Sequence, residues 1–343
     1  MLDPAGIYQY TEADVAPDGK FSSLLNLLAA STSDQVTNLK GLVQAIQGFG
    51  GNEYENAGCE VAQRGYQQFS TPGRYTIDRH YLLVCNGSYV FFREFYGRDA
   101  PYGGVIVATS ATNSTKMVQP YEAVSVRRWA GTQRTFSALI EGTPGAQITL
   151  AIEVSTVADT ATGGTWTAVG SAVVSLGTTG AWATVTASIP ATARGLRLAF
   201  ITNNNPASSS VYWSLPTWVK GTQRGIYAPK HASYSAELLA CSRHYFSADY
   251  LTVPMIAFNS GNALTGKISF PVRMRAVPTV TVSDSNGTLG RITGIANNGS
   301  PVSNMIPPVS VSIYADGWFY NGGGLPITAP AMLGFNFTAS AEL

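Results

Sequence analysis

The stretch Ser235-Ala-Glu-Leu-Leu-Ala-Cys-Ser-Arg-His-Tyr-Phe246 is one of the few in this chain where helical spacing outweighs strand character. Ser235 is a favourable N-cap residue, and Glu237 lies in the first turn, where the helix dipole stabilises a carboxylate. Three further residues recur at helical spacing: Leu238, Cys241 and Tyr245. Because β-rich sequence lies on both sides, we expect a short helix between two β domains.

The composition favours a protein made largely of β-strands. Only 12% of the 343 residues are charged, whereas glycine occurs 35 times and proline 18 times. Low charge with abundant glycine is typical of short strands joined by tight turns, and it suits an oligomer or a larger assembly. The formal net charge of +1 gives no electrostatic argument for nucleic-acid binding, which usually needs a basic face.

The three cysteines, Cys59, Cys85 and Cys241, show no metal-binding spacing. Their number is odd, so we expect reduced, buried thiols, and we expect neither a metal nor a cofactor. The residues after Met1 have neither the basic segment nor the apolar run of a secretory signal, and no apolar stretch is long enough to insert into a membrane. We therefore expect the protein to be made in the cytoplasm.

Changes of pattern along the chain predict a mainly β fold, with two antiparallel, jelly-roll-like β-sandwich domains and a short N-terminal helical bundle segment. The predicted boundaries are an arm at 1–20, a helical oligomerisation segment at 21–51, a first sandwich at 52–225, a linker helix at 226–250 and a C-terminal β domain at 251–343.

The region 52–225 is expected to consist of short strands. β-branched and aromatic residues fill 76–85 and 89–96. Further expected strands are 125–129, 134–140, 147–154, 168–174, 183–189, 195–201 and one that begins at Val211. Seven or eight such strands are enough for a jelly-roll sandwich.

The segment 21–51 carries the other helical pattern of the chain. The apolar residues expected at its oligomer contacts are Leu25, Leu28, Val36, Leu39, Val43 and Ile46, of which the last four have heptad spacing. Short helices with so few apolar residues cannot bury a core alone, so we expect them to associate in a homotrimer. The alternative is that they pack on the β domain of the same chain.

Three stretches, in chain order, resemble segments of bacteriophage tail fibres and minor tail proteins. The first is Asn56-Ala-Gly-Cys-Glu-Val-Ala-Gln-Arg-Gly65, followed by Tyr75-Thr-Ile-Asp-Arg-His80. The second is 235–246, which is similar to the family's Glu-Leu-x-x-Cys-x-Arg-Tyr-Tyr. The third is Ser269-Phe-Pro-Val-Arg-Met-Arg-Ala-Val-Pro-Thr-Val-Thr281, and 335–343 resembles the family's usual ending.

This sequence departs from the family pattern at several positions. His80 replaces a tryptophan, Cys59 replaces an aromatic residue, and Ser242-Arg-His244 replaces Gln-Arg-Tyr. At 216–221 the sequence is Pro-Thr-Trp-Val-Lys-Gly, where the family usually carries Gln-Leu-Glu-x-Gly. The strand order of 52–225 also resembles the carbohydrate-binding-module sandwiches that recur in phage adhesins.

The resemblance implies a structural virion protein of a tailed phage, a short tail fibre or receptor-binding protein that attaches to host-surface glycan. Residues 1–20 would contact other virion proteins, and the homotrimer would be assembled in the host cytoplasm and reside in the tail. The alternatives are a head fibre or decoration protein that binds no glycan, and a glycan hydrolase.

Nothing in the sequence supports the hydrolase alternative. A glycosidase needs two carboxylates on opposite sides of a sugar, and no acidic residue lies in a recognisable motif. The pair Gln63 and Arg64 invites a catalytic interpretation, but we interpret it as structural, with bonds to turn carbonyls and to Asp78. We therefore expect no enzymatic activity and no catalytic residue.

Sugar binding needs a flat aromatic ring beside side chains that bond hydroxyl groups. The stretch 316–324 brings such residues together, and a glycine-rich loop at 163–167 carries a further tryptophan. The candidate glycan contacts are Trp318, Tyr320, Asp316, Asn321 and Trp166. The alternative for each tryptophan is a packing role, within a β domain or, for Trp318, against a neighbouring chain of the trimer.

Overall fold

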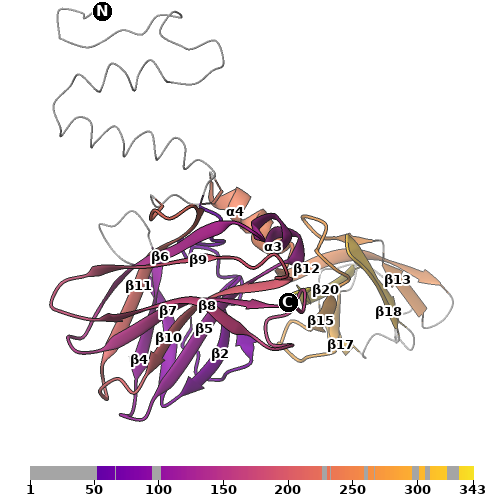
Figure 1. Cartoon of the computed structure of the whole chain (residues 1–343). Helices are drawn as coiled ribbons and strands as arrows, with labels where there is room; N and C mark the ends of the chain where they lie inside the picture. The colour runs from indigo at the N-terminus through magenta and orange to yellow at the C-terminus, as the bar shows by residue number, and fades with distance from the viewer. Residues whose placement is uncertain are drawn as a thin grey trace, which may run out of the picture. The chain divides into compact units, whose positions relative to one another are not determined.

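The computed structural model describes residues 52–65, 67–94, 102–225, 230–231, 233–258, 262–265, 267–295, 301–305, 310–322 and 332–343 (Figure 1). Asn52–Leu343 forms one compact unit. The predicted arm at 1–20 and the predicted oligomer contacts Leu25, Leu28, Val36, Leu39, Val43 and Ile46 lie outside the described residues. Neither helix in the described part of the chain has the length and apolar character that a membrane span requires.

The described residues are mainly β-strands, as the composition predicted, and all of the strand pairs are antiparallel. A six-stranded sheet has the order β1 (Arg74–Tyr75), β2 (Tyr81–Asn86), β5 (Ser114–Tyr121), β10 (Gly195–Asn203), β7 (Gln147–Ser155) and β8 (Thr167–Ser175). A five-stranded sheet has the order β3 (Ser88–Glu94), β4 (Tyr102–Ala108), β11 (Ser210–Lys220), β6 (Gln133–Gly142) and β9 (Ala181–Ser188).

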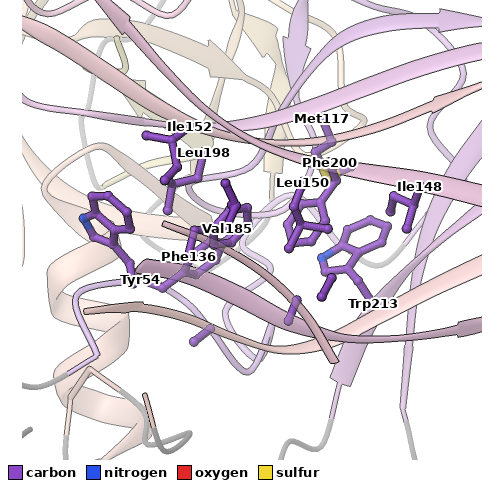
Figure 2. Packing of buried hydrophobic residues seen from close by; sticks show 14 of the residues in the cluster. Tyr54, Met117, Phe136, Ile148, Leu150, Ile152, Val185, Leu198, Phe200 and Trp213 are labelled. Atoms are coloured by element: carbon purple, nitrogen blue, oxygen red, sulfur yellow. The ribbon is translucent and has the colours of Figure 1, made fainter. Parts of the chain in front are cut away.

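One hydrophobic core takes side chains from both of these sheets. In β7, alternate residues Ile148, Leu150 and Ile152 are buried in it, which is the period of two that a strand imposes. Phe200 of β10 lies 5.4 Å from Phe136 of β6 between ring centroids. Figure 2 shows these aromatic rings together with Met117 and Trp213 in the core. Contacts between rings of different sheets therefore hold the two sheets together.

Helix α3 (Ala123–Trp129) corrects the prediction of a strand at 125–129. Ala123, Val126 and Trp129 are buried, whereas Arg127 and Arg128 between them are exposed. Buried residues three apart form one face of a helix, and a window of five residues was too short to separate this spacing from strand alternation.

Helix α4 (Tyr234–Ser242) confirms the expected helix, but it begins and ends at other residues than the predicted stretch 235–246. The N-cap is Ser233, not Ser235, and the Ser233 side chain accepts a hydrogen bond from the Ala236 amide at 3.3 Å. Strand β12 (Tyr245–Phe258) begins inside the stretch predicted as helical. Its first residues pair with β20 (Met332–Ser340), because Phe246 packs against the core that Phe337 of β20 enters.

The C-terminal strands form one hydrogen-bonded sheet in the described residues, where a second two-sheet sandwich was predicted for 251–343. The remaining strands are β13 (Asn262–Thr265), β14 (Ile268–Ser269), β15 (Thr279–Ser283), β16 (Ile292–Ile295), β17 (Pro301–Met305), β18 (Ser310–Tyr314) and β19 (Gly317–Gly322). The long strand β12 pairs with β20 along its first part and with β13 along its last four residues. This continuity through β12 joins all nine strands.

Cys59, Cys85 and Cys241 are buried, as expected, and no disulfide bond joins them; burial raises the pKa of each thiol. We predict that a thiol reagent without reductant finds three thiols per chain in denaturant and reacts only slowly with the native protein, because the thiolate is the reactive form. Fewer than three reactive thiols in denaturant would contradict the free state.

The packing of Gly104 against Trp213 gives a second prediction. A Cβ at Gly104 would lie 1.8 Å from Cζ2 of Trp213, whereas a Cβ at Gly177 would meet nothing within 4 Å. Gly104→Ala should lower the free energy of unfolding by about 1–3 kcal/mol, because Trp213 is fully buried and cannot move aside to make room for the new methyl group. Gly177→Ala should change it by less than about 0.5 kcal/mol. Urea unfolding of both variants measures the difference, and equal values would contradict the packing.

Candidate functional site

The carboxylate of Asp78 lies where the first stretch of family resemblance folds back on itself. Only 1% of its side chain is exposed. The Gln63 amide donates to Asp78 Oδ2 at 2.8 Å, and Arg64 Nη1 donates to Asp78 Oδ1 at 3.2 Å. A buried carboxylate needs such partners, because losing its hydration costs several kcal/mol. These contacts confirm the predicted bonds of Gln63 and Arg64 to Asp78.

The same two residues reach the C-terminal sheet. Gln63 Nε2 donates to the Tyr245 carbonyl at 2.8 Å, and the Ser247 amide donates to Gln63 Oε1 at 3.3 Å. Arg64 Nη2 donates a hydrogen bond to Glu342 Oε2, and the guanidinium of Arg64 lies 3.5 Å from the centroid of the Tyr245 ring. Gln63 and Arg64 therefore fix both β12 and the last residues of the chain to the turn that contains Asp78.

The side chain of Arg79, which is only 1% exposed, forms a second set of contacts beside Asp78. Its backbone has φ +71°, and its side chain pairs with Glu55 and donates to the Pro120 carbonyl at 2.8 Å. Arg79 Nη1 lies 3.0 Å from His244 Nδ1. Since arginine only donates, Nδ1 must accept, and the His244 proton lies on Nε2, 3.3 Å from Glu122. Burial lowers the pKa of His244 well below its ordinary value, in agreement with this neutral tautomer.

His80, one of the departures from the family pattern, is also buried with partners on both ring nitrogens. Nδ1 lies 3.1 Å from the Asp78 carbonyl, and Nε2 lies 3.2 Å from the Tyr54 hydroxyl. Burial lowers the pKa of His80 to about 4, so the ring is neutral at pH 7. Nδ1 then donates to the carbonyl, and Nε2 accepts from Tyr54.

An open groove of about 550 Å³ lies beside Arg64, and we call it the junction groove. Its lining residues are Arg64, Gln67, Phe69, Pro72, Gly73, Arg74, Tyr75, Tyr245, Ser340 and Glu342. Two tyrosine rings, two guanidinium groups and one carboxyl group thus face a common space. Five of these residues (Arg64, Tyr75, Tyr245, Ser340 and Glu342) belong to the stretches for which the resemblance to tail proteins was noted.

Glu342 and Asp78 share Arg64 but differ in their protonation. Burial raises the pKa of Glu342 to about 8, and the attraction of Arg64 only partly opposes it. Burial likewise raises the pKa of Asp78, but only to about 6, because Arg64 and the Gln63 amide stabilise its charged form. At pH 7 Asp78 therefore carries the charge opposite Arg64, and Glu342 is protonated. Its proton lies on Oε1, since Oε2 accepts from Arg64.

The junction groove has the groups that bind a polar ring. Glu342 is part of the lining, and its Oε1 is buried and has no hydrogen-bond partner among the described residues. Tyrosine rings offer apolar faces, and guanidinium groups donate to ring oxygens. In the described lining Glu342 is the single carboxyl group, whereas glycoside hydrolysis needs two. In the described part of the chain, no cluster of His, Cys, Asp or Glu side chains could hold a metal ion.

Trp318, a predicted glycan contact, is 0% exposed in β19. Its ring lies 5.4 Å from the rings of both Phe335 and Phe337 in the core of the C-terminal sheet. This corrects the expectation of an exposed ring. The reason is register: Trp318 pairs with Ile268 and Ile313, on the face of β19 that turns towards β20.

The other predicted contacts in this stretch do not gather around Trp318. Asp316 is exposed and forms an ion pair with Lys267, whose hydrogen bond lowers the pKa of the carboxyl. Tyr320 and Asn321 belong to β19, but their side chains lie outside the described part of the structure.

Trp166 lies in the loop before β8 and is half-buried. Its Nε1 donates to the Gly163 carbonyl at 3.0 Å, and the Arg197 guanidinium lies 4.2 Å from its ring centroid. One face of the ring is therefore occupied by Arg197, whose side chain also pairs with Glu153.

The junction groove was not predicted from the sequence. The available signal was that Arg64, Tyr75 and Tyr245 all lie in the stretches for which a resemblance to tail proteins was noted. No periodicity could show that residues so far apart share a surface.

No protein-family model matches this sequence, and no curated protein matches it. Several solved structures are similar to about half of the chain. One is the enzymatically active domain of tailspike protein 4 of bacteriophage CBA120, with 9% identity and a TM-score of 0.36 over 50% of this chain and 21% of that chain.

Two carbohydrate-binding modules are also similar. The module TmCBM61, in complex with β-1,4-galactotriose, has 13% identity and a TM-score of 0.32 over 50% of this chain and 99% of that chain. The C-terminal family 22 module of Clostridium thermocellum Xyn10B has 12% identity and a TM-score of 0.31 over 48% of this chain and 99% of that chain. Likenesses with such low TM-scores do not assign a function to this chain.

The raised pKa of Glu342 predicts a pH dependence of stability. A carboxyl group whose pKa rises from 4.5 to about 8 on folding stabilises the protein fully below pH 4.5, and this contribution is lost as the pH rises through about 8. Glu342→Gln keeps the neutral form, so its free energy of unfolding should fall less than that of the wild type between pH 5 and 8. The difference is at most about 1.4 kcal/mol per pH unit.

Urea unfolding at several pH values measures this slope. The exposed Asp316 serves as the control, because Asp316→Asn should leave the slope between pH 5 and 8 unchanged. Asp78 is present in both proteins and cancels in the comparison. Parallel curves for the wild type and Glu342→Gln would show that Glu342 is ionised throughout.

The burial of Trp318 gives a further prediction. Trp318→Ala should lower the free energy of unfolding by about 3–5 kcal/mol, because it empties the core of the C-terminal sheet. The half-exposed Tyr314 on the neighbouring strand is the control, and Tyr314→Ala should cost much less. Equal melting temperatures for the two variants would contradict the core position of Trp318.

Proposed function

We propose that this protein is a structural component of a phage tail, a short fibre or receptor-binding protein, and that it attaches to host-surface glycan through the junction groove. One observation carries the proposal. Arg64, Tyr75, Tyr245 and Glu342 come from separate stretches that resemble tail proteins, and they line one open groove. In this proposal the helical segment 21–51 forms the homotrimer, and residues 1–20 attach to the virion.

A sugar in the groove would make contact both through the apolar face of its ring and through its polar oxygens. The apolar face of a pyranose would rest against Tyr75 or the free face of Tyr245, and its hydroxyl and ring oxygens would accept from Glu342 Oε1 and from Arg74 on the exposed rim. Burying one sugar face on an aromatic ring contributes about 1–2 kcal/mol. A single groove would bind weakly, and several copies on one particle would provide avidity.

A structural virion protein that binds no glycan is the second candidate. It is favoured by the fact that Arg64 and Glu342 also bond to each other in the buried network that joins β12 and the end of the chain. Packing alone would then explain why these residues match the family pattern. Neither candidate function requires catalysis. This agrees with the single carboxyl group in the described groove lining, since glycoside hydrolysis needs two.

Arg74 separates the two candidates, because it lines the groove but is exposed and makes little contribution to the buried network. We predict that the purified full chain binds polysaccharides on an array of bacterial surface glycans, and that Arg74→Ala weakens this binding about tenfold, as expected for a hydrogen bond from a charged donor. Arg127→Ala, at an exposed arginine of α3, is the matched control and should bind as the wild type does.

Melting temperatures accompany the array measurement. Arg74→Ala should melt within a few degrees of the wild type, which separates lost binding from lost folding. Binding that is equal in the wild type and Arg74→Ala would remove the groove as the site. A wild-type chain that binds no glycan on the array would favour the second candidate.

A further inference from the structure

A second, more enclosed pocket lies at the N-terminus of α4. Its volume is about 210 Å³, and its lining residues are Asn56, Gly58, Glu60, His231, Ser233, Tyr234 and Glu237. We call it the α4 pocket. None of its lining residues borders the junction groove. Liquid water occupies about 30 Å³ per molecule, so the volume of the α4 pocket equals that of about seven water molecules. A space of this size suits a single sugar ring.

Glu237 is a buried carboxyl group, and burial raises its pKa, which the backbone amides of Asn56 and His231 partly oppose. Its residue is 6% exposed, and Oε1 accepts a hydrogen bond from the Asn56 amide. Oε2 is buried and has no hydrogen-bond partner in the described part of the chain. A buried polar atom without a partner costs free energy, so such an atom at the wall of a pocket indicates that a ligand or ordered water completes it.

His231 presents a second atom of this kind. Its Nε2 is buried and has no partner among the described residues, and burial lowers the pKa of the ring, so the ring is neutral at pH 7. A neutral imidazole can accept at Nε2 when its proton lies on Nδ1. The α4 pocket therefore offers two acceptors, Glu237 Oε2 and His231 Nε2, to a group that donates more than one hydrogen bond.

The charge around the α4 pocket favours a cation. Glu60 and Glu237 are the ionisable acids of its described lining, which includes no lysine or arginine. The neighbouring Lys230 is paired with Glu55 at 2.9 Å. The N-terminus of α4 opposes a cation with only about half an elementary charge, which is less than one ionised carboxylate supplies.

We propose that the α4 pocket binds the ammonium group of an amino sugar. The ammonium donates to Glu237 Oε2 and to His231 Nε2, and the sugar ring packs against Tyr234, which is 52% exposed at the pocket rim. An exposed aromatic ring is suited to a pyranose face rather than to a bare amine. The α4 pocket is distinct from the junction groove, so this inference does not depend on the proposed function of the groove.

The experiment titrates the full chain with glucosamine by calorimetry and uses N-acetylglucosamine as the matched ligand without a charge on nitrogen. We expect glucosamine to bind and N-acetylglucosamine to bind at least tenfold more weakly, because a charge-assisted hydrogen bond is lost. Ethylammonium, an amine without a sugar ring, should also bind more weakly than glucosamine. Arg74→Ala in the junction groove should leave glucosamine binding unchanged.

Two variants test the residues. Glu237→Gln keeps an oxygen for the Asn56 amide but removes the charge, and it should weaken glucosamine binding about tenfold or more. Tyr234→Ala changes an exposed residue, so it should fold normally and still weaken glucosamine binding several-fold. Leu239→Ala, at a 44% exposed residue of the same helix outside the pocket, is the control and should bind as the wild type does.

Each contrary result overturns a stated part of the inference. Equal binding of glucosamine and N-acetylglucosamine, or unchanged binding in Glu237→Gln, would remove the ammonium site. Ethylammonium that binds as tightly as glucosamine, together with unchanged binding in Tyr234→Ala, would show an amine pocket that does not recognise a sugar. If the wild type binds none of the three ligands, the α4 pocket is not a site for amines.

Discussion

The bonds from the Gln63 amide and the Arg64 guanidinium to the Asp78 carboxylate are the contacts on which the rest of the structure depends. The side chain of Asp78 is only 1% exposed, and an unpaired charge there would cost several kcal/mol. Once these groups are placed, Gln63 has its amide oxygen and nitrogen in position for the backbone of β12, and Arg64 has its second nitrogen in position for Glu342. The orientation of the C-terminal sheet at this contact follows from one buried ion pair.

The same residues explain why a packing motif and a ligand groove coincide. Arg64 uses its guanidinium nitrogens for Asp78 and Glu342, and its flat face for the ring of Tyr245. Glu342 lines the groove, with one oxygen bonded to Arg64 and the other buried without a hydrogen-bond partner among the described residues. A side chain that is held from one side in this way is preorganised, so a ligand on the other side would meet fixed donors and aromatic faces at little further cost in entropy.

The sequence predicted those features of the fold that arise from local patterns. Strands such as 147–154 were found because alternate residues enter the core, and α4 was found because its residues recur at helical spacing. The strand predicted at 125–129 was wrong because α3 is shorter than the window that separates the two periods. The exposure of Trp318 could not be predicted, since it depends on which face of β19 turns towards β20. The contact of Asp78 with Gln63 and Arg64 was predicted, but the contact of Arg64 with Glu342 was not, because nothing local links residues 278 positions apart.

That separation has a consequence for synthesis on the ribosome. Gln63 meets Tyr245 across 182 positions, and Arg64 meets Glu342 across 278. At translation rates of about 5–20 residues per second, the segment around Arg64 waits about 14 to 56 seconds for its last partner. The two sheets that share the first core can form during this interval, but the turn at Gln63 and Arg64 has not yet met β12. A nascent chain of this protein therefore carries an incomplete, adhesive surface until residues 245–342 have been made, and crowded polysomes or slow translation of this segment would favour misassembly between neighbouring copies.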